Sequence, residues 1–486
     1  MNIDRRLLLS SAALLASPVL RADPVGNCAG AQSELPLAPP PPVTKTIAQF
    51  VGSSRYEDLP ANVRHEGVRT FVNWMGVAVG GSRNEAVVKA IAALAPFAGR
   101  PEASVLGRRE RFDILNAALI NGISSHVLDY DDTHLKTIIH PAGPVAPAIL
   151  ALAQHRPISG KDFLHALILG IEVECRIGNA IYPSHYDLGW HITGSCGVFG
   201  SAVASGKLLK LTEQQMIWAI GIAASQPVGL KVQFGSMTKS FHPGRAAQNG
   251  LTAALLAEQN FTANDAALEG KDGFVQATSR KVKWEEISKG LGTHYEAALN
   301  TYKPFACGIV THPAIDAAIQ LRNKYNLRPE QIAAVELHAN PLVLSLTGKT
   351  EPRTGLEGKF SIYHCIAVAL IYGAAGPKQF TDVVVRDPTV IALRKRVSVR
   401  TDPAVKTQQS DLTIRLKDGR QLMLHIQNAI GSLEKPLSDA ALEGKFIDLA
   451  DGVLPSNRAQ ALVKMCWDLQ RQPDAGTVAA AAQAQA

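Results

Sequence analysis

Apolar residues recur three or four positions apart through much of the first half of the chain, which is the period of an amphipathic helix. This spacing predicts helices over 61–78 and 83–97. A third helix is predicted from the apolar positions Phe112, Leu115, Leu119, Ile123, Val127 and Tyr130. Polar caps predict two further helices, starting at Ser159 and Thr212. The first of these is almost wholly apolar as far as Ile181, so we expect it to be buried.

The pattern changes to strict alternation of apolar and polar residues in the second half, which is the period of a β-strand. Three strands are predicted from Val335, Leu337 and Ala339, from Leu412, Ile414 and Leu416, and from Leu422, Leu424 and Ile426. Asp418-Gly419 lies between the last two and is typical of a hairpin turn. We therefore expect an antiparallel sheet in this part of the chain.

These patterns divide the chain into four parts. Residues 43–275 are expected to be the first segment of a helical domain, and 276–430 a smaller α+β domain. Helical signals return over 431–472, and we expect this segment to pack back on the helical domain. Residues 473–486 are of low complexity and are expected to form a disordered tail. The predicted fold class is mainly α.

The N-terminus has the pattern of a targeting segment. Residues 1–22 combine a charged start with an apolar run and a plausible cleavage point after Ala22, which is typical of a signal peptide. Arg5-Arg6 resembles a twin-arginine signal, and an ordinary secretory signal is the alternative. A proline-rich linker follows over 23–42. We expect a periplasmic protein with no membrane segment after removal of the signal.

Composition and charge narrow the range of partners. The 486 residues are 46% hydrophobic and 19% charged, as in ordinary soluble proteins of two or three domains. The net charge of +7 is spread along the chain, which does not favour nucleic-acid binding but suits a basic site for a small polyanion. None of the six cysteines forms a CxxC pair, so a zinc or thioredoxin-type motif has no support. We interpret most of them as buried small apolar residues.

The predicted helix that starts at Phe112 is expected to finish in three aspartates, Asp129, Asp131 and Asp132. At a helix C-terminus each carboxylate opposes the macrodipole, at a cost of several tenths of a kcal/mol. We therefore expect these carboxylates to pair with cations or to take part in chemistry. A divalent-cation site, which would fit a metal-dependent hydrolase, and plain solvated charge are the alternatives.

Four later clusters combine histidine or lysine with glycine and proline, a composition typical of ligand-binding loops. They contain His191, the pair Lys239 and His242 with Arg245, then Lys271, and finally Lys303 with His312. Lysine and arginine can hold the carboxylates of a small polyacid, and a histidine can move a proton beside a carboxylate. His191 by itself also fits a structural histidine. Ser236 and Lys239 match S-x-x-K, but the SDN and KTG motifs that accompany it in serine β-lactamases do not occur.

Taken in order, these motifs resemble the MmgE/PrpD family. The segments are HVLDYDDTH, HPAGPVAPAILALA, GWHITGSCGVFGSA, TKSFHPGRAAQNG, LEGKDGF, THPAID and EGKFSIYH, and they extend from about residue 65 to 430. The resemblance implies an all-helical domain built from both ends of the chain, with a smaller α+β lid inserted between them. It also implies a homodimer, and chemistry without metal or cofactor in the cleft between the domains.

The resemblance also assigns roles to residues. Asp129, Thr133, His140, His191 and Lys239 match positions that we expect to be catalytic. In this scheme His140 and His191 carry protons, and Asp129 orients or charges them. The residues expected to bind substrate are Asp132, His242, Arg245 and Lys271. We predict that Asp129, His140, His191 and Lys239 converge on one pocket facing the lid.

The expected function is that of a metal-free lyase that dehydrates a small di- or tricarboxylate, as 2-methylcitrate dehydratase does. A decarboxylase of the cis-aconitate type or an epimerase of the same family is the first alternative. A non-catalytic periplasmic polycarboxylate-binding protein is the second, because Phe305 stands where many members of the family have tyrosine.

Overall fold

The computed structural model describes residues 40–484, and its fold class is mainly α, as predicted. The signal peptide and most of the proline-rich linker lie outside this range, so both remain predictions. The helices of the first part of the chain are α1 (Val43–Ser53), α2 (Ala61–Gly81), α3 (Glu85–Leu94), α4 (Ile114–His126), α5 (Ala142–His155), α6 (Gly160–Ile181), α7 (Ser184–Asp187), α8 (Ile192–Leu208), α9 (Glu213–Ala224), α10 (Thr238–Glu258), α11 (Phe274–Thr278) and α12 (Glu285–Ser288). None of the helices in the described range is long and apolar enough to cross a membrane.

Side-chain caps fix the starts of these helices where the sequence predicts them. The Ser159 hydroxyl accepts the backbone N–H of Asp162 at the start of α6. Thr212 and Gln215 form a reciprocal capping box at the start of α9. Each cap accepts a hydrogen bond from a backbone N–H that the first turn leaves without a partner, and this stabilises the helix by about 1 kcal/mol.

The end of α4 differs from the prediction. The helix ends at His126, and the three aspartates come after it rather than in its last turn. Asp129 has a positive φ of 50°, a left-handed conformation that aspartate tolerates better than most residues, and it turns the chain away from the helix axis. Asp132 then begins the short strand β3 (Asp132–His134).

Two of the predicted ligand-binding loops are helices. His191 is the N-cap of α8, and Lys239 and His242 lie within α10 despite Pro243. Glycine lets α10 approach α4, because a Cβ atom on Gly122 would lie 2.4 Å from Cα of Gly244. The small residues of these segments therefore allow close helix packing rather than a flexible loop.

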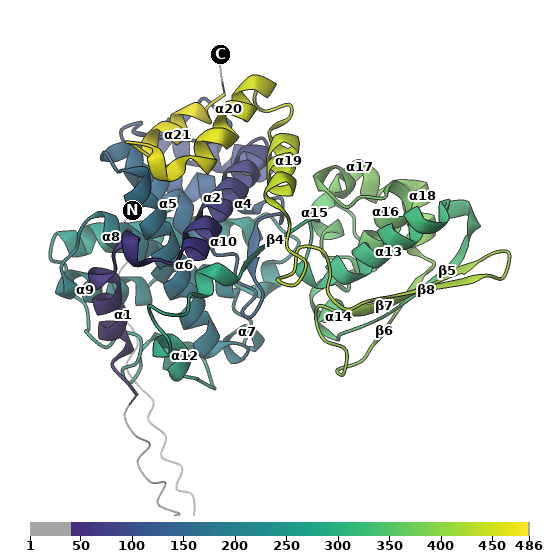
Figure 1. The fold of residues 1–486 in the computed structure, drawn as a ribbon, viewed down its shortest axis with the longest axis horizontal. Helices are drawn as coiled ribbons and strands as arrows, with labels where there is room; N and C mark the ends of the chain where they lie inside the picture. Colours follow the sequence, from purple (N-terminus) through teal and green to yellow (C-terminus); the bar gives the residue numbers. More distant parts are fainter. Residues whose placement is uncertain (1–39, 485–486) are drawn as a thin grey trace, which may run out of the picture. The chain divides into compact units, whose positions relative to one another are not determined.

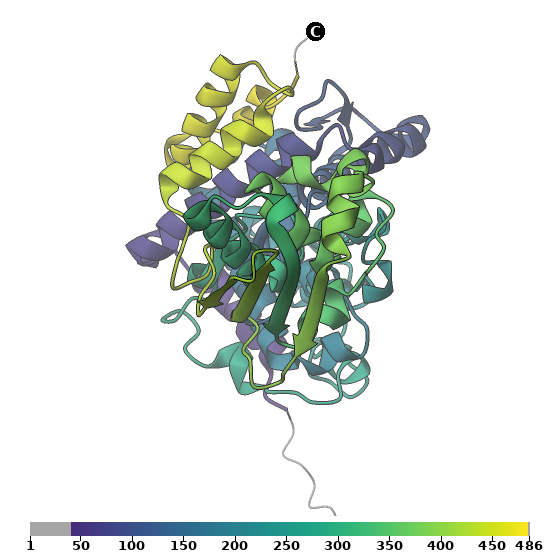
Figure 2. The same cartoon turned by 90° about the vertical axis from the view of Figure 1, so that its right-hand side faces the viewer.

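The second part of the chain contains the predicted sheet. Its strands are β5 (Ile332–Ala339), β6 (Val397–Thr401), β7 (Ser410–Leu416) and β8 (Gln421–Ile426), in the order β6-β5-β7-β8, and they lie side by side in Figure 2. The hairpin between β7 and β8 turns at Gly419 as predicted, with φ at 89°. The three predicted strands β5, β7 and β8 pair antiparallel, as expected. Strand β6, which was not predicted, adds a parallel pair with β5, with Val335 opposite Val397.

Helices cover one face of this sheet. They are α13 (His312–Tyr325), α14 (Leu342–Thr347), α15 (Gly355–Gly358), α16 (Ile362–Tyr372), α17 (Asp382–Val385) and α18 (Pro388–Arg394). Ile315 of α13 and Ile366 of α16 pack with Leu337 and Ile414 of the strands in one apolar cluster. The sheet therefore has a core of its own.

The change to this second core comes later than residue 276. α12 packs against α6, and strand β4 (Asn300–Tyr302) pairs with β3 of the helical part. The second core cluster begins at Phe305, so the predicted boundary is about thirty residues too early. Because the chain from Pro40 onward forms one compact unit, a separate lid domain remains a prediction.

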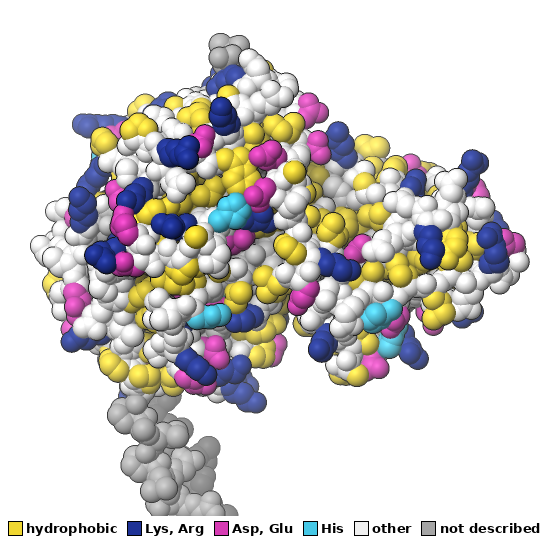
Figure 3. Space-filling view, in the orientation of Figure 1, with side chains coloured by type: hydrophobic (Ala, Val, Ile, Leu, Met, Phe, Trp, Pro, Cys, Tyr) yellow, Lys and Arg dark blue, Asp and Glu magenta, His cyan; other side chains and the backbone are white. Residues whose placement is uncertain are grey.

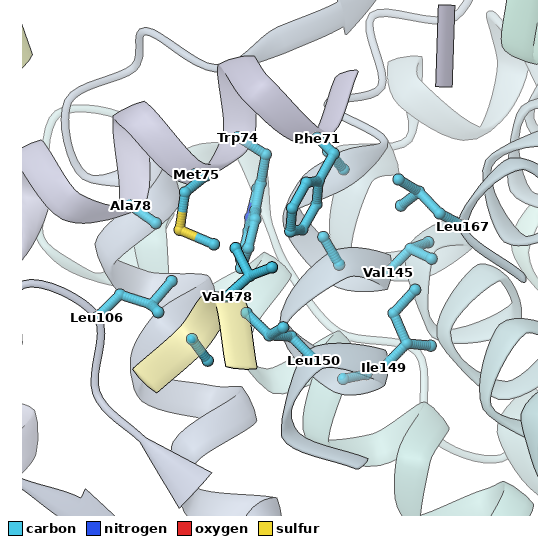
Figure 4. Close-up of a cluster of buried hydrophobic side chains, with 14 of the residues drawn as sticks. Phe71, Trp74, Met75, Ala78, Leu106, Val145, Ile149, Leu150, Leu167 and Val478 are labelled. Carbon is cyan, nitrogen blue, oxygen red and sulfur yellow. The ribbon is translucent and has the colours of Figure 1, made fainter. Parts of the chain in front are cut away.

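The C-terminal helices α19 (Asp439–Ala450) and α20 (Ser456–Trp467) lie against α2, in yellow beside purple in Figure 1. The prediction of a disordered tail is wrong for α21 (Gly476–Ala481), which packs on α5. Figure 4 shows Val478 of α21 among Trp74, Met75 and Leu150. The small residues of the tail fit closely, because a Cβ atom on Gly476 would lie 2.5 Å from the Ala153 carbonyl oxygen.

Candidate active site

The crossing of α4 and α10 brings the first two polar groups of the site together. His126 ends α4 four residues after Gly122, and Lys239 lies in the first turn of α10, ahead of Gly244. With the two glycines in contact, Nζ of Lys239 lies 2.9 Å from Nε2 of His126. Both side chains are buried.

Asp129 is the anionic centre of the site. Its Oδ1 atom accepts from Nζ of Lys303 at 2.7 Å and from Nζ of Lys239 at 3.1 Å. Burial raises the pKa of Asp129, but the two ammonium groups outweigh burial and hold this pKa well below its usual value. Oδ2 has no hydrogen-bond partner among the described residues. One buried carboxylate thus faces two buried lysines.

His126 and Asp131 form a second buried pair. Nδ1 of His126 lies 2.6 Å from Oδ2 of Asp131, and its Nε2 faces Lys239. Because the ammonium of Lys239 can only donate, His126 is best described as a neutral imidazole that donates from Nδ1 to Asp131. Burial lowers the pKa of His126 despite the attraction of Asp131. The ring of His126 therefore lies between the carboxylate of Asp131 and the ammonium group of Lys239 and is hydrogen-bonded to both.

His140 and His191 each keep one ring nitrogen without a hydrogen-bond partner among residues 40–484. Nδ1 of His140 lies 2.8 Å from the Asp132 carbonyl oxygen, and Nδ1 of His191 lies 2.9 Å from Nδ1 of His242. Burial lowers the pKa of both His140 and His191 well below the usual value, and nearby cations add to this effect. Both rings are therefore neutral near pH 7. The carbonyl oxygen fixes the proton of His140 on Nδ1 and leaves its Nε2 as an acceptor, whereas either ring can donate in the contact between His191 and His242.

Asp129, His140, His191 and Lys239 line one small cavity, as the sequence predicts for these four side chains. The cavity has a volume of about 30 Å³, and Tyr186, Phe234 and Phe360 form part of its apolar wall. That these four residues carry catalysis stays a prediction. Their convergence gives a site in which two neutral bases and two ammonium groups face the same small space.

The structure adds lysines that the sequence analysis does not assign to the site. Lys303 lines the cavity, and Lys359 is buried nearby, where its Nζ donates to the carbonyl oxygens of Leu128 and Ala306. Burial lowers the pKa of Lys359 to about 8. Lys359 lies in EGKFSIYH, a motif that carries the family resemblance, and Lys303 lies two residues before Phe305, where many members of the family have tyrosine; these are the signals that could have identified them.

Lys445 of α19 joins the C-terminal segment to the same region. Its Nζ donates to the carbonyl oxygens of Tyr130 and Lys303, at 2.7 and 2.9 Å. It also lies 3.8 Å from the centre of the Tyr130 ring. Lys445 thereby fixes the backbone on both sides of the Asp129–Lys303 pair.

Two residues predicted to bind substrate lie away from the cavity. Arg245 lies about 240° around α10 from Lys239, so its side chain is exposed on another face of the helix. There it donates to Gln248 of the same helix. Lys271 is exposed and lines a separate surface hollow with Phe261. The structure therefore does not support direct substrate contacts for Arg245 and Lys271 at this cavity.

The remaining predicted residues are buried behind the cavity wall. Oδ2 of Asp132 accepts from the Ala142 backbone and from Asn300. Burial, together with Asp131, raises the pKa of Asp132 to about 7. Thr133 lies in β3, with Oγ1 3.4 Å from Nδ1 of His140. His242, Asp132 and Thr133 are therefore placed to support His191 and His140 rather than to touch a ligand.

A metal site at these residues is geometrically possible but competes with existing partners. One ligand atom from each of His126, His140 and His191 lies within 4.8 Å of the others, and so do those of Asp129, Asp131 and His140. However, both ring nitrogens of His126 are already engaged, one of them by the ammonium of Lys239. A divalent cation would lie next to Lys239 and Lys303 and would be repelled by them.

The positive charge of the site is internal. On the face drawn in Figure 3, acidic and basic side chains are interspersed rather than gathered by sign. Lys239, Lys303, Lys359 and Lys445 are all buried. Burial of four ammonium groups is costly unless each has partners, so their presence around one small cavity is typical of a site for anions.

Comparisons with known proteins agree with this geometry. Residues 45–287 match the MmgE/PrpD N-terminal domain, and 305–469 match the MmgE/PrpD C-terminal domain. The chain is 27% identical to a cis-aconitate decarboxylase of Aspergillus terreus over 461 residues, which is 89% of this chain and 94% of the relative. It is also 27% identical to that of Mus musculus, over 89% of this chain and 91% of the relative. A 2-methylcitrate dehydratase of Cupriavidus necator is 24% identical over 79% of this chain and 84% of the relative. The chain therefore belongs to the MmgE/PrpD family.

Proposed function

We propose that this protein is a lyase that acts on a small di- or tricarboxylate by moving a proton at a carbon next to a carboxylate, without a metal ion. One observation carries the proposal: two buried lysines share a single carboxylate oxygen of Asp129 in a cavity that two neutral histidines also line. Together these groups can bind an anion and exchange a proton with it.

Charge supports an anionic substrate. Among the charged residues that line the cavity, Asp129 carries one negative charge, while Lys239 and Lys303 carry two positive charges. A substrate carboxylate supplies the missing counter-charge, and an ammonium group binds a carboxylate through strong charge-assisted hydrogen bonds. The same ammonium groups stabilise the enolate-like charge that develops when the neighbouring carbon loses a proton or CO₂.

The histidines supply proton transfer. His140 and His191 are neutral because their pKa values are lowered by burial. Nε2 of His140 is an acceptor, and Nε2 of His191 is one when His191 donates to His242. A neutral imidazole can remove a proton from carbon, and the imidazolium that results can return a proton to the product. Asp131 lies 3.5 Å from Nδ1 of His140, where it stabilises the charged ring.

Loss of CO₂ is the reaction we rank first, which reverses the order expected from the sequence. The cis-aconitate decarboxylases match this chain at 26–27% identity over 89% of its length, against 22–24% over 64–79% for the 2-methylcitrate dehydratases. In decarboxylation the bond between carbon and a carboxylate breaks, CO₂ leaves, and the electron pair left on carbon takes a proton from a histidine that has first been protonated from solvent. Dehydration, the second candidate, instead needs a neutral histidine to remove a proton from carbon and an acid to protonate the departing hydroxide.

Incubation of the purified mature protein with cis-aconitate, citrate and 2-methylcitrate tests the proposal, with products followed by NMR. We expect turnover of at least one acid, and either CO₂ or water as the second product identifies the reaction. Lys303→Met should abolish turnover, while Lys271→Met should leave it unchanged as a matched control on the surface. Binding by calorimetry without any product would instead support a periplasmic binding protein. If the acids are neither bound nor turned over, a polycarboxylate ligand is refuted.

Export, dimerisation and a closing lid belong to the same proposal. The sequence of residues 1–22 supports export, and family membership supports a homodimer and a cleft covered by the α+β segment. Cell fractionation and light scattering on the purified protein test the first two. Substrate-dependent protection of residues 305–430 from hydrogen exchange tests the third.

A further inference from the structure

A second and larger cavity lies beside the one described above. It has a volume of about 270 Å³ and shares three wall residues with the smaller cavity, namely Ile138, Ile309 and Val310. The smaller cavity, at about 30 Å³, has room for only about two water molecules. A tricarboxylate is larger than this space, and the second cavity offers further room next to it, beyond these three side chains.

The walls of the second cavity are mainly apolar. Leu135, Tyr182, Ile430 and Leu433 contribute to them, together with the three shared residues. Ile430 and Leu433 are 41% and 42% exposed. An apolar group bound here would remove apolar surface of both side chains from water, which is favourable.

The residue between the two cavities has a strained backbone. Ile138 has a φ of 62°, a left-handed conformation that is rare for a β-branched residue. Its backbone N–H donates to the His134 carbonyl oxygen at 2.8 Å, and His140 follows two residues later. Such strain is maintained only where the surroundings impose it, and it is concentrated at ligand-binding sites. The strain at Ile138 thus lies at the boundary that a long substrate would have to cross.

We propose that the second cavity binds an apolar chain of several carbons, so that the preferred substrates are di- or tricarboxylates whose alkyl substituent is longer than methyl. The carboxylates lie at Lys239 and Lys303, and the chain passes Ile138, Ile309 and Val310. This inference rests on the proposed function, since it assigns the substrate of the same site. It goes beyond that function because it requires kcat/KM to rise with each carbon added to the chain.

The test is a series of tricarboxylates with n-alkyl substituents of one to six carbons, compared with the unsubstituted acid. Each methylene buried in the cavity is expected to raise kcat/KM about fourfold until the cavity is full. Leu433→Asp places a carboxylate in the cavity wall without touching the residues around Asp129. It should lower kcat/KM about tenfold or more for the hexyl compound, and less than about twofold for the unsubstituted acid.

Two further variants separate this effect from general destabilisation. Leu433→Ala should give a smaller loss with the same dependence on chain length. Val383→Asp is a matched control, because Val383 is an aliphatic side chain of the α+β segment that is 80% exposed and does not line this cavity. Its kcat/KM values should follow those of the unmodified protein across the series.

The outcomes distinguish this inference from the function on which it rests. A rise with chain length that Leu433→Asp removes supports the inference. Turnover of the unsubstituted acid with no gain, or with a loss, from longer chains overturns the inference and leaves the proposed function standing. Absence of turnover and of calorimetric binding for every acid in the series overturns both.

Discussion

Removal of the charge of Asp129 provides a direct test of the electrostatic description of the site. Asp129→Asn keeps the shape of the side chain but leaves Lys239 and Lys303 without their common counter-charge. At an effective dielectric constant of 20, the attractions at 3.1 and 2.7 Å are about 5 and 6 kcal/mol before repulsion between the lysines is counted. Measured costs of breaking a buried ion pair are about 3–5 kcal/mol, and we expect the variant to lose this much unfolding free energy.

A double-mutant cycle separates charge from packing. Lys303→Met leaves Asp129 paired with Lys239. In the double variant Asp129→Asn, Lys303→Met only Lys239 is charged, so the net charge of the three positions is the same as in the unmodified protein. The double variant should therefore be less destabilised than the sum of the single variants, by about 2 kcal/mol. Urea unfolding followed by circular dichroism measures all four proteins, with unchanged m-values as the condition for comparison.

The control is an ion pair on the surface. Glu336 lies 3.3 Å from Arg415 on the exposed face of the sheet, and Glu336→Gln should cost less than about 1 kcal/mol. Additive losses in the cycle, or a cost of Asp129→Asn no larger than that of Glu336→Gln, would show that the lysines do not depend on Asp129. The account of an anionic centre shared by two cations would then be wrong.

Three other outcomes follow from the same description. His140→Gln and His191→Gln should each lower kcat by roughly 10²- to 10⁴-fold with the fold retained, as steady-state kinetics and circular dichroism would show; a loss under threefold for both contradicts their role as proton carriers. EDTA should leave turnover unchanged, because Lys239 and Lys303 repel a divalent cation; a loss that Zn²⁺ or Mn²⁺ restores would establish the metal alternative. Burial lowers the pKa of His185 to about 4, below its unfolded value of about 6.5, so its contribution to stability is complete above that value and declines as the pH falls towards 4. The free energy of unfolding should therefore fall by about 2 kcal/mol between pH 6.5 and 5 because of this residue. In His185→Gln, urea unfolding should show a fall that is smaller by the same amount.

Local patterns in the sequence predict those parts of the fold that local interactions determine. The caps at Ser159 and Thr212 and the turn at Gly419 depend only on neighbouring residues, and the structure confirms them. The parallel pairing of β5 and β6 was not predictable in this way, because two strands separated by more than fifty residues carry no local sign of their direction.

The helices α8, α10 and α21 show where tertiary contacts override composition. Glycine and proline disfavour a helix by about 1 and 3 kcal/mol in isolation, so the segment around Pro243 suggests a loop. In the folded chain the same small residues permit close contacts, since a Cβ atom on Gly197 would lie 2.3 Å from Cγ of Pro144. That benefit depends on a partner helix that no pattern within the segment reveals.

The sequence motifs identify some residues of the site but do not show how all of them are placed. His140, His191 and Lys239 were identified from the residues around them, and the structure brings them to one cavity with Asp129. Lys303 belongs to a noted cluster, but its role depends on the pairing of β4 with β3, which places it against Asp129. Arg245 lies away from this cavity because a helix, rather than the predicted loop, fixes its direction.

The three aspartates show why the cluster is tolerated at all. Three carboxylates within four residues would repel one another strongly if all were charged and unpaired, and the structure gives each a different solution. Asp129 is neutralised by two lysines, and Asp131 is held charged by His126 and His140, whereas Asp132 has its pKa raised to about 7 by burial and by Asp131. Neighbouring groups whose pKa values are driven apart are typical of sites that move protons. The cluster is thus better explained by proton transfer than by binding of a cation, because Asp129 and Asp131, the two carboxylates that could share a cation with His140, already have lysine and histidine partners.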